Sequence, residues 1–347
     1  MLRRTLLRRP RDSDFHESFA NSPISNYRSF MSQKDPRPYI WMLCGSFSFT
    51  LMAVLAHILL HVDRSCDWQT VAVFRAGLVA VFGAILAHVS GVKLVFWPWR
   101  LWVRSIAGSC SMLCTFYAFG MLSVHDVVTL TNTFPIWVAL LSWPLYGLFP
   151  GVRILVAILI GVGGVILVEQ PHFQNGNLGV VTALAAAVFT AVAMLGLHSL
   201  GGLDPRAIVV HFSMVATVFC LAALCIGPRQ HSTSEILALP VILRLLGMGI
   251  AALIGQLFLT LAFVQGAPAK VSVVGLTQIV FAFIFDVCFF DERLLNAESL
   301  IGTALVITPT AWLLTRTRRY SEPIEELPPR EAQSPMEMPR SEKEERD

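Results

Sequence analysis

The sequence predicts an all-α integral membrane protein with ten transmembrane helices, and three observations carry this prediction. Of 347 residues, 55% are hydrophobic and 14% are charged, and the mean hydropathy is +0.64, whereas a soluble domain carries roughly 25% charged residues. Ten apolar segments follow one another along the chain, and most approach the roughly 20 residues that a helix needs to span a bilayer. The basic residues gather at the two ends of this apolar region.

The first half of the apolar region contains five of these segments. Each is expected to be a helix, because lipid satisfies no backbone hydrogen bonds, and the segments lack the alternation of barrel strands. Trp97, Trp99 and Trp102 precede the third segment as interfacial anchors. The five segments are Tyr39–His61, Thr70–His88, Ser105–Leu122, Val127–Phe149 and Gly151–Val168.

The second half repeats the pattern with five more segments joined by short loops. The loop at Gly266–Lys270 leaves little more than a turn, so neighbouring helices must run antiparallel and no extramembrane catalytic domain fits between them. The five segments are Leu178–Leu200, Ala207–Ile226, Leu245–Phe263, Val271–Phe290 and Ser299–Leu314.

Charge placement predicts that both chain ends are cytoplasmic. With that orientation the inner loops and near tails hold twelve basic residues against four outside, as the positive-inside rule requires. The inner set is Arg28, Lys34, Arg37, Lys93, Arg100, Arg104, Arg153, Arg206, Lys270, Arg316, Arg318 and Arg319, and the outer set is Arg64, Arg229, Arg244 and Arg293. We therefore expect a multi-pass protein, in the plasma membrane.

The chain divides into four parts by composition. Residues 1–38 and 317–347 are polar, charged tails that we expect to be disordered and cytoplasmic. An organelle-targeting sequence is an alternative for the Arg-rich N-terminus. Residues 39–169 and 176–316 are two five-helix halves. Phe116–Phe119 (FYAF) aligns with Thr260–Phe263 (TLAF), and because five is odd the two halves must be inverted relative to each other, as in many transporters.

Three stretches of the sequence resemble the drug/metabolite transporter superfamily, in its EamA-like ten-helix branch. They are VAVFRAGLVAVF with Arg75, FYAFGMLSVHDVVTLTNTFPIWVALLSW with Pro135, and LAFVQGAPAKVSVVGLTQIVFAFIFDVCFFDERLL, in which Asp291-Glu292-Arg293 stand where the family usually has Gly-Glu-Arg. The sequence departs from the family at Leu148-Phe149-Pro150 and Gln278-Ile279. The resemblance implies a central cavity between two halves and transport of small organic metabolites.

Two charged residues are candidates for substrate binding. Arg75 lies early in the second segment, where it would face an anionic group in a cavity, or reach the nearby interface or an ion pair. Asp286 is the acid well inside an apolar run, and it would bind a cationic substrate, carry a coupling proton, or make a structural hydrogen bond near the helix end.

Several uncharged polar residues are further candidates. Thr129, Asn132 and Thr133 share one helix face by their spacing, and Pro135 interrupts the backbone ladder just beyond them. Substrate contact and helix–helix hydrogen bonding are the two interpretations. Tyr117, Gln256 and Gln278 would also line a cavity or pack between helices.

We therefore expect a secondary carrier for an amino-acid-like, amine or similar polar solute, acting by alternating access with proton-coupled export. The alternatives are a nucleotide-sugar or phosphorylated-solute antiporter and a non-transporting sensor or assembly protein. No enzyme activity, cofactor, metal or nucleic-acid partner is expected. Gly161, Gly163 and Gly164 allow close helix packing, within the chain or in a homodimer.

Overall fold

The computed structural model describes residues 35–318 except for residues 64, 120, 123, 148, 172–176, 227–235, 237 and 291–296. The remaining residues of both predicted tails, and Arg64, Arg229, Glu292 and Arg293, lie outside the described residues. Every regular element in the described part is a helix. Nine helical spans there are long and apolar enough to cross a membrane.

The first half contains helices that match the five predicted segments in order. They are α3 (Arg37–His57), continued by the π-helical η1 (Ile58–Val62), α4 (Trp68–Val89), α5 (Trp99–Phe119), α6 (Val124–Thr131), α7 (Phe134–Tyr146) and α8 (Val152–Glu169). The 21-residue α5 is not among the nine apolar spans, because its first turns carry Arg100 and Arg104.

The second half follows the same order. Its helices are α9 (Asn177–His198), α10 (Pro205–Ile226), α12 (Leu239–Gln265), α13 (Pro268–Gly275), α14 (Thr277–Phe285), the π-helical η2 (Asp286–Phe290) and α15 (Ala297–Arg318).

Two helices begin six residues earlier than predicted. The structure starts α5 at Trp99 rather than Ser105, and α12 at Leu239 rather than Leu245. Pro240 lies in the first turn of α12, where its missing N–H would have had no helical partner. Arg104 and Arg244, which we assigned to loops, therefore belong to helices. A search for apolar runs excludes both residues because a charged side chain lowers the mean hydropathy of its segment.

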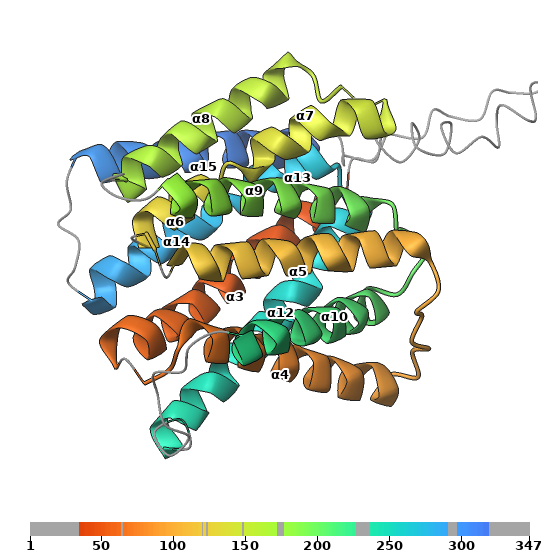
Figure 1. The fold of residues 1–347 in the computed structure, drawn as a ribbon. Helices are drawn as coiled ribbons and strands as arrows, with labels where there is room; N and C mark the ends of the chain where they lie inside the picture. Colours follow the sequence, from red (N-terminus) through yellow and green to blue (C-terminus); the bar gives the residue numbers. More distant parts are fainter. Residues whose placement is uncertain are drawn as a thin grey trace, which may run out of the picture.

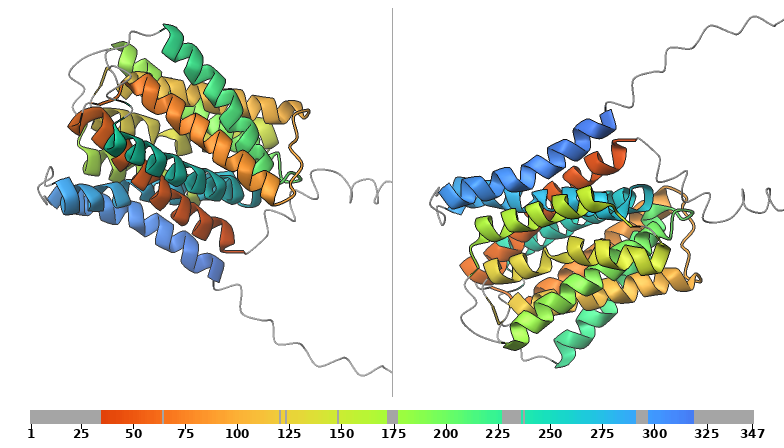
Figure 2. Two further views of the ribbon diagram at one scale, coloured as in Figure 1. Left: turned by 90° about the horizontal axis from the view of Figure 1, so that it is seen from below. Right: turned by 90° about the horizontal axis from the view of Figure 1, so that it is seen from above.

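The helices pack in pairs that join the two halves (Figure 1). The extensive contacts are α3 with α12, α9 with α5, α4 with α10, and α8 with α15. The first spanning helix of each half thus packs on the third spanning helix of the other half, and the second spanning helices of the two halves pack on each other. The start of α3 and the end of α15 lie at the same end of the bundle (Figure 2).

The fourth span of each half is interrupted. Between α6 and α7 the helix opens into a turn at Asn132 and Thr133, whereas the sequence predicts the interruption just beyond these two residues, at Pro135. Between α13 and α14 it opens at Leu276, where no proline stands. The two breaks face each other, since a Cβ built on Gly275 would lie 3.6 Å from the Phe134 ring.

Glycines set the distance between α8 and α15. A Cβ on Gly164 would lie 2.7 Å from the carbonyl oxygen of Gly302, and a Cβ on Gly302 would lie 2.7 Å from that of Gly164. A Cβ on Gly161 would lie 2.7 Å from the Leu276 side chain, whereas one on Gly163 meets nothing within 4 Å. Gly161 and Gly164 thus mediate packing within the chain.

The outer surface of the bundle is apolar. Large side chains such as Val81, Ile85, Leu159 and Val218 are more than half exposed. A soluble monomer rarely exposes an apolar surface on this scale, so lipid is the solvent that this surface suits.

Candidate functional site: a small cavity between the two halves

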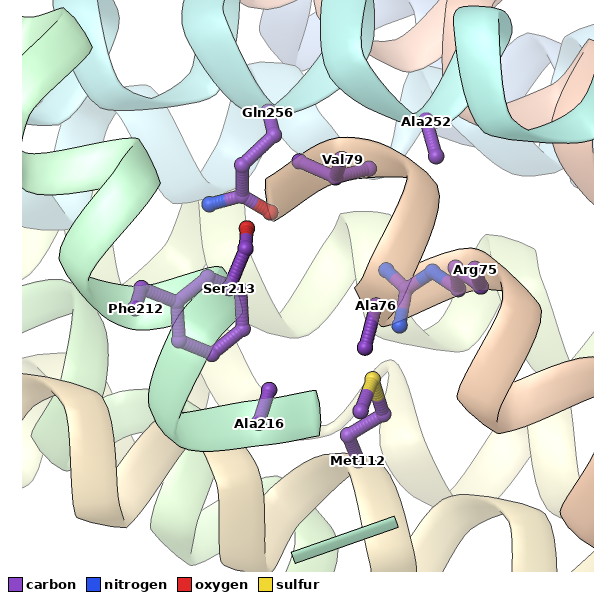
Figure 3. A pocket seen from close by; sticks show the side chains of 9 residues that line it. All are labelled: Arg75, Ala76, Val79, Met112, Phe212, Ser213, Ala216, Ala252 and Gln256. Atoms are coloured by element: carbon purple, nitrogen blue, oxygen red, sulfur yellow. The ribbon is translucent and has the colours of Figure 1, made fainter. Parts of the chain in front are cut away.

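A small cavity lies where four helices meet (Figure 3). Two of the helices, α4 and α5, come from the first half, and two, α10 and α12, come from the second. The cavity is lined by Arg75, Ala76, Val79, Met112, Phe212, Ser213, Ala216, Ala252 and Gln256. Its free space holds about one water molecule, so the four helices pack closely around it.

Arg75 brings a positive charge into this cavity. Its side chain extends from α4 toward the interior (Figure 3), and its Nε lies 3.1 Å from the sulfur of Met52. A thioether is a weak acceptor, and no carboxylate among the described residues pairs with this guanidinium. An unpaired arginine costs about 2.5–3.5 kcal/mol at mid-helix on insertion scales. The cavity therefore holds an uncompensated cation.

Two neutral polar side chains complete the lining. Gln256 on α12 is buried, and Ser213 on α10 is 1% exposed. In Figure 3 both side chains lie across the cavity from Arg75. The cavity thus offers a cation on one side and a donor–acceptor pair on the other, with apolar walls between them.

A second arginine lies directly behind the cavity wall. Arg104 on α5 is 1% exposed, and its guanidinium carbon lies 4.0 Å from the centre of the Phe212 ring. Its Nε and Nη1 find no hydrogen-bond partner among the described residues. A desolvated cation–π contact contributes about 2 kcal/mol, which is less than the cost of several kcal/mol for burying an ion. The sequence predicts Arg104 in an inner loop, whereas the structure places it inside α5.

The neighbouring helices leave room for Arg104. A Cβ on Gly108, one turn along α5, would lie 2.6 Å from Nη1 of Arg104. A Cβ on Gly196 of α9 would lie 3.0 Å from Cβ of Arg104. Next to it, the Ser105 hydroxyl is 2.8 Å from Nδ1 of the buried His211, whose Nε2 has no partner among the described residues. A buried pair of polar side chains, Ser105 and His211, therefore lies beside Arg104.

Two of the three polar residues predicted to share a face of the fourth span, Asn132 and Thr133, form hydrogen bonds with the backbone of their own span. The Asn132 side-chain amide donates to the Val128 carbonyl at 2.8 Å, and the Thr133 hydroxyl donates to the Leu130 carbonyl at 2.6 Å. Both satisfy backbone acceptors at the break between α6 and α7. The Thr129 hydroxyl is buried without a partner among the described residues. None of the three lines the cavity.

The other break is stabilised from α3. The Thr50 hydroxyl donates to the backbone carbonyl of Gln278 at 3.1 Å, and the Ser46 hydroxyl donates to that of Gly275 at 3.4 Å. Such side-chain donors satisfy backbone acceptors that lipid cannot. The side chain of Gln278 is partly buried but does not line the cavity.

Two further candidates lie away from the cavity. Tyr117 is 39% exposed on α5, and Asp286 begins η2, directly after α14. Of the predicted site residues, the cavity brings together Arg75 and Gln256. Sequence reasoning missed Ser213 and Phe212, because single serine and phenylalanine residues in an apolar helix carry no distinguishing pattern.

At the far end of α3 an ion pair joins the two halves. Asp63, just after η1, pairs with Arg244 on α12. Within the described ranges, no group of three or more His, Cys, Asp or Glu side chains could hold a metal ion.

A family model matches the chain twice. The model describes the EamA-like transporter family, and it matches residues 36–169 and 177–315. The cavity thus draws α4 and α5 from the first matched segment and α10 and α12 from the second.

Curated relatives carry transporter names. The pseudopaline exporter CntI of Pseudomonas aeruginosa is 28% identical over 79% of this chain and 94% of its own. An uncharacterised transporter of Helicobacter pylori is 26% identical over 60% of this chain and 70% of its own. The human solute carrier family 35 member G1 is 26% identical over 55% of each chain.

A solved crystal structure of another protein has the same fold. It superimposes with a TM-score of 0.64 at 17% identity, covering 80% of this chain and 98% of its own. At this level of identity the likeness concerns the fold alone.

Proposed function

We infer the function from one premise: the chain belongs to the EamA-like transporter family of the drug/metabolite transporter superfamily. It is a multi-pass integral membrane transporter. We propose that it is a secondary carrier for a small polar organic solute, either amino-acid-like or an amine, and that it works by alternating access.

The observation that carries this proposal is the position of the cavity. Arg75 comes from the first matched segment, whereas Ser213 and Gln256 come from the second. In carriers built from two repeats, substrate binds between the repeats, and one moves against the other around the site. A cavity with room for about one water is too small for an organic solute, so the helices must separate before a solute binds.

The architecture we propose has ten crossings in two inverted repeats. In this arrangement α5 is the crossing beyond the nine apolar spans, and its polar face is turned into the protein. The reciprocal packing of α3 on α12 and α9 on α5 supports a two-fold relation between the halves. Interrupted spans at corresponding places in both halves support it further. We also propose that both termini are cytoplasmic and that the membrane is the plasma membrane.

The test is transport by the purified protein in proteoliposomes. Solutes that raise its melting temperature, because they bind the folded state, are expected to be carried. Gln256→Leu should reduce their uptake by about two- to tenfold, since one buried hydrogen bond contributes about 0.5–1.5 kcal/mol and 1.4 kcal/mol is a factor of ten.

The matched control is Thr308→Leu. Thr308 is exposed on α15, and its hydroxyl bonds to its own helix at Ala304. This variant should carry the same solutes at the wild-type rate. If no solute is moved, a sensor or assembly role replaces the carrier. If Gln256→Leu transports normally, the cavity is not the substrate site.

We propose that a proton gradient drives export of the solute and that Asp286 carries the coupled proton. The sequence has no phosphate-binding loop of the GxxxxGK[ST] type, so a gradient is the natural driving force. Asp286→Asn should abolish the dependence of transport on an imposed pH gradient while counterflow of labelled substrate continues. Gradient dependence that survives the substitution would exclude this carboxyl as the proton carrier.

A further inference from the structure

The proposal here rests on the carrier function and concerns the charge of the carried solute: of the solutes proposed above, it excludes the amine. We propose that the solute is an organic anion, and that its anionic group binds Arg75 in the cavity and also Arg104 once the Phe212 ring, which lines the cavity and contacts the Arg104 guanidinium, moves aside.

The first step is the charge around the cavity. Arg75 lines it and Arg104 lies against the ring that forms part of its wall. No carboxylate among the described residues pairs with either. Cations without a paired anion at this place disfavour a cationic solute. An anion brought in by the solute would compensate both.

The second step is the state of Arg104. Its side chain is almost completely buried, yet Nε and Nη1 have no acceptor among the described residues. Buried polar groups are normally hydrogen-bonded, so each exception requires an explanation. Arginine also carries a planar fork of donors that matches a carboxylate or phosphate. A site that binds an anion in only part of its cycle would leave this fork empty in the other part.

The third step is that the chain makes space for this arginine. A Cβ on Gly108 would lie 2.6 Å from Nη1 of Arg104, and a Cβ on Gly196 would lie 3.0 Å from Cβ of Arg104, so a larger residue at either position would press on this side chain. A residue that merely anchored α5 at an interface would lie at the surface, with its charge in water. The charge lies instead between α5, α9 and α10.

The fourth step concerns Phe212. Its ring is in contact with the Arg104 guanidinium on one side and contributes to the cavity wall on the other. The adjacent His211 is tied to Ser105, the neighbour of Arg104, by a hydrogen bond of 2.8 Å. Movement of α10 against α5 would therefore change the ring and the arginine together, as an opening of the cavity requires.

The experiment uses sets of solutes with one carbon skeleton and different charge. Glutarate, glutaramide and 1,5-diaminopentane form one set, and the C2–C6 homologues form the others. Glycerol 3-phosphate and inorganic phosphate separate a phosphate from a carboxylate preference. Full-length protein in detergent is assayed for melting temperature, and proteoliposomes are assayed for competition with uptake. Anions should bind, and the neutral and cationic partners should bind at least tenfold more weakly.

Two variants test Arg104. Arg104→Met keeps an unbranched chain against Phe212 and removes the charge, so the ligand-free protein should melt at the same or a higher temperature. Its anion affinity should fall about 10- to 100-fold, as expected for lost hydrogen bonds to a charged group. Arg104→Lys keeps the charge without the fork and should retain part of the affinity. A purely structural arginine would give lower stability with unchanged anion affinity.

The outcomes separate this proposal from the carrier function. Transport of amines or neutral solutes without any anion overturns the anion proposal and leaves the carrier intact. Anion binding that both Arg104 variants retain in full also overturns it. Absence of all transport removes the carrier function itself, and the anion proposal with it.

Discussion

Gly164→Leu is expected to prevent stable packing of α8 against α15. A Cβ at this position would lie 2.7 Å from the Gly302 carbonyl oxygen, 2.9 Å from Val306 and 3.0 Å from Leu305. No side-chain rotamer relieves a collision between a Cβ and a backbone oxygen, so the two helices must separate. Overpacking of a core costs about 1–3 kcal/mol, and we expect the upper part of that range. Melting temperature and size-exclusion profile of the purified protein measure the effect.

Gly163→Leu is the matched control for this substitution. Gly163 is the preceding residue on the same helix, and a Cβ there meets nothing within 4 Å. Both variants add the same apolar side chain, and both exchange glycine for a better helix former. Equal melting temperatures for Gly163→Leu and Gly164→Leu would contradict a tight glycine contact between α8 and α15. A change confined to Gly163→Leu would indicate a contact with another copy of the chain.

Much of the fold could be predicted from the sequence because the bilayer imposes a simple rule on it. Apolar stretches of sufficient length must be helices, and this rule locates α3, α4, α8, α9, α10 and α15 well. It fails for the first turns of α5, where Arg100 and Arg104 lower the hydropathy. Arg104 is tolerated because it faces α9 and α10 rather than lipid. Which side of a helix faces lipid is a tertiary property, and a hydropathy profile averages over it.

The interrupted spans show the same division. Pro135 predicts an interruption of the helix near the break between α6 and α7, because proline lacks a backbone N–H donor. Nothing comparable marks the break at Leu276, whose neighbouring carbonyls are satisfied by Ser46 and Thr50 of α3, more than 200 residues away in sequence. Hydroxyl donors from a distant helix leave no local pattern, so this break could not be predicted.

The candidate site was predictable in part. Charge or amide groups in apolar helices are costly and therefore informative, and this reasoning found Arg75 and Gln256. The same reasoning selected Asn132 and Thr133, whose side chains bond to their own backbone within four residues. Short polar side chains often make such local bonds. Helical spacing does not distinguish these bonds from contacts across a cavity.

Arg75→Met is expected to lower substrate uptake about 10- to 100-fold, because a hydrogen bond to a charged group contributes about 1.5–3 kcal/mol and each 1.4 kcal/mol is a factor of ten. Within the described lining, Arg75 is the charged side chain. Its removal leaves Gln256 and Ser213 as the polar groups of the cavity. The measurement is initial uptake in proteoliposomes at equal protein content, together with substrate-induced stabilisation of the purified variant.

Arg75→Lys distinguishes recognition of the solute from anchoring of the helix. If Arg75 binds the solute, Arg75→Lys retains the charge and should keep part of the uptake, while Arg75→Met loses it with an unchanged or higher melting temperature. If Arg75 instead reaches the membrane interface, both variants should carry substrate at the wild-type rate. The contact of its Nε with Met52 at 3.1 Å favours recognition. A weak sulfur acceptor inside the bundle compensates little of the charge, which leaves the guanidinium available to a bound anion.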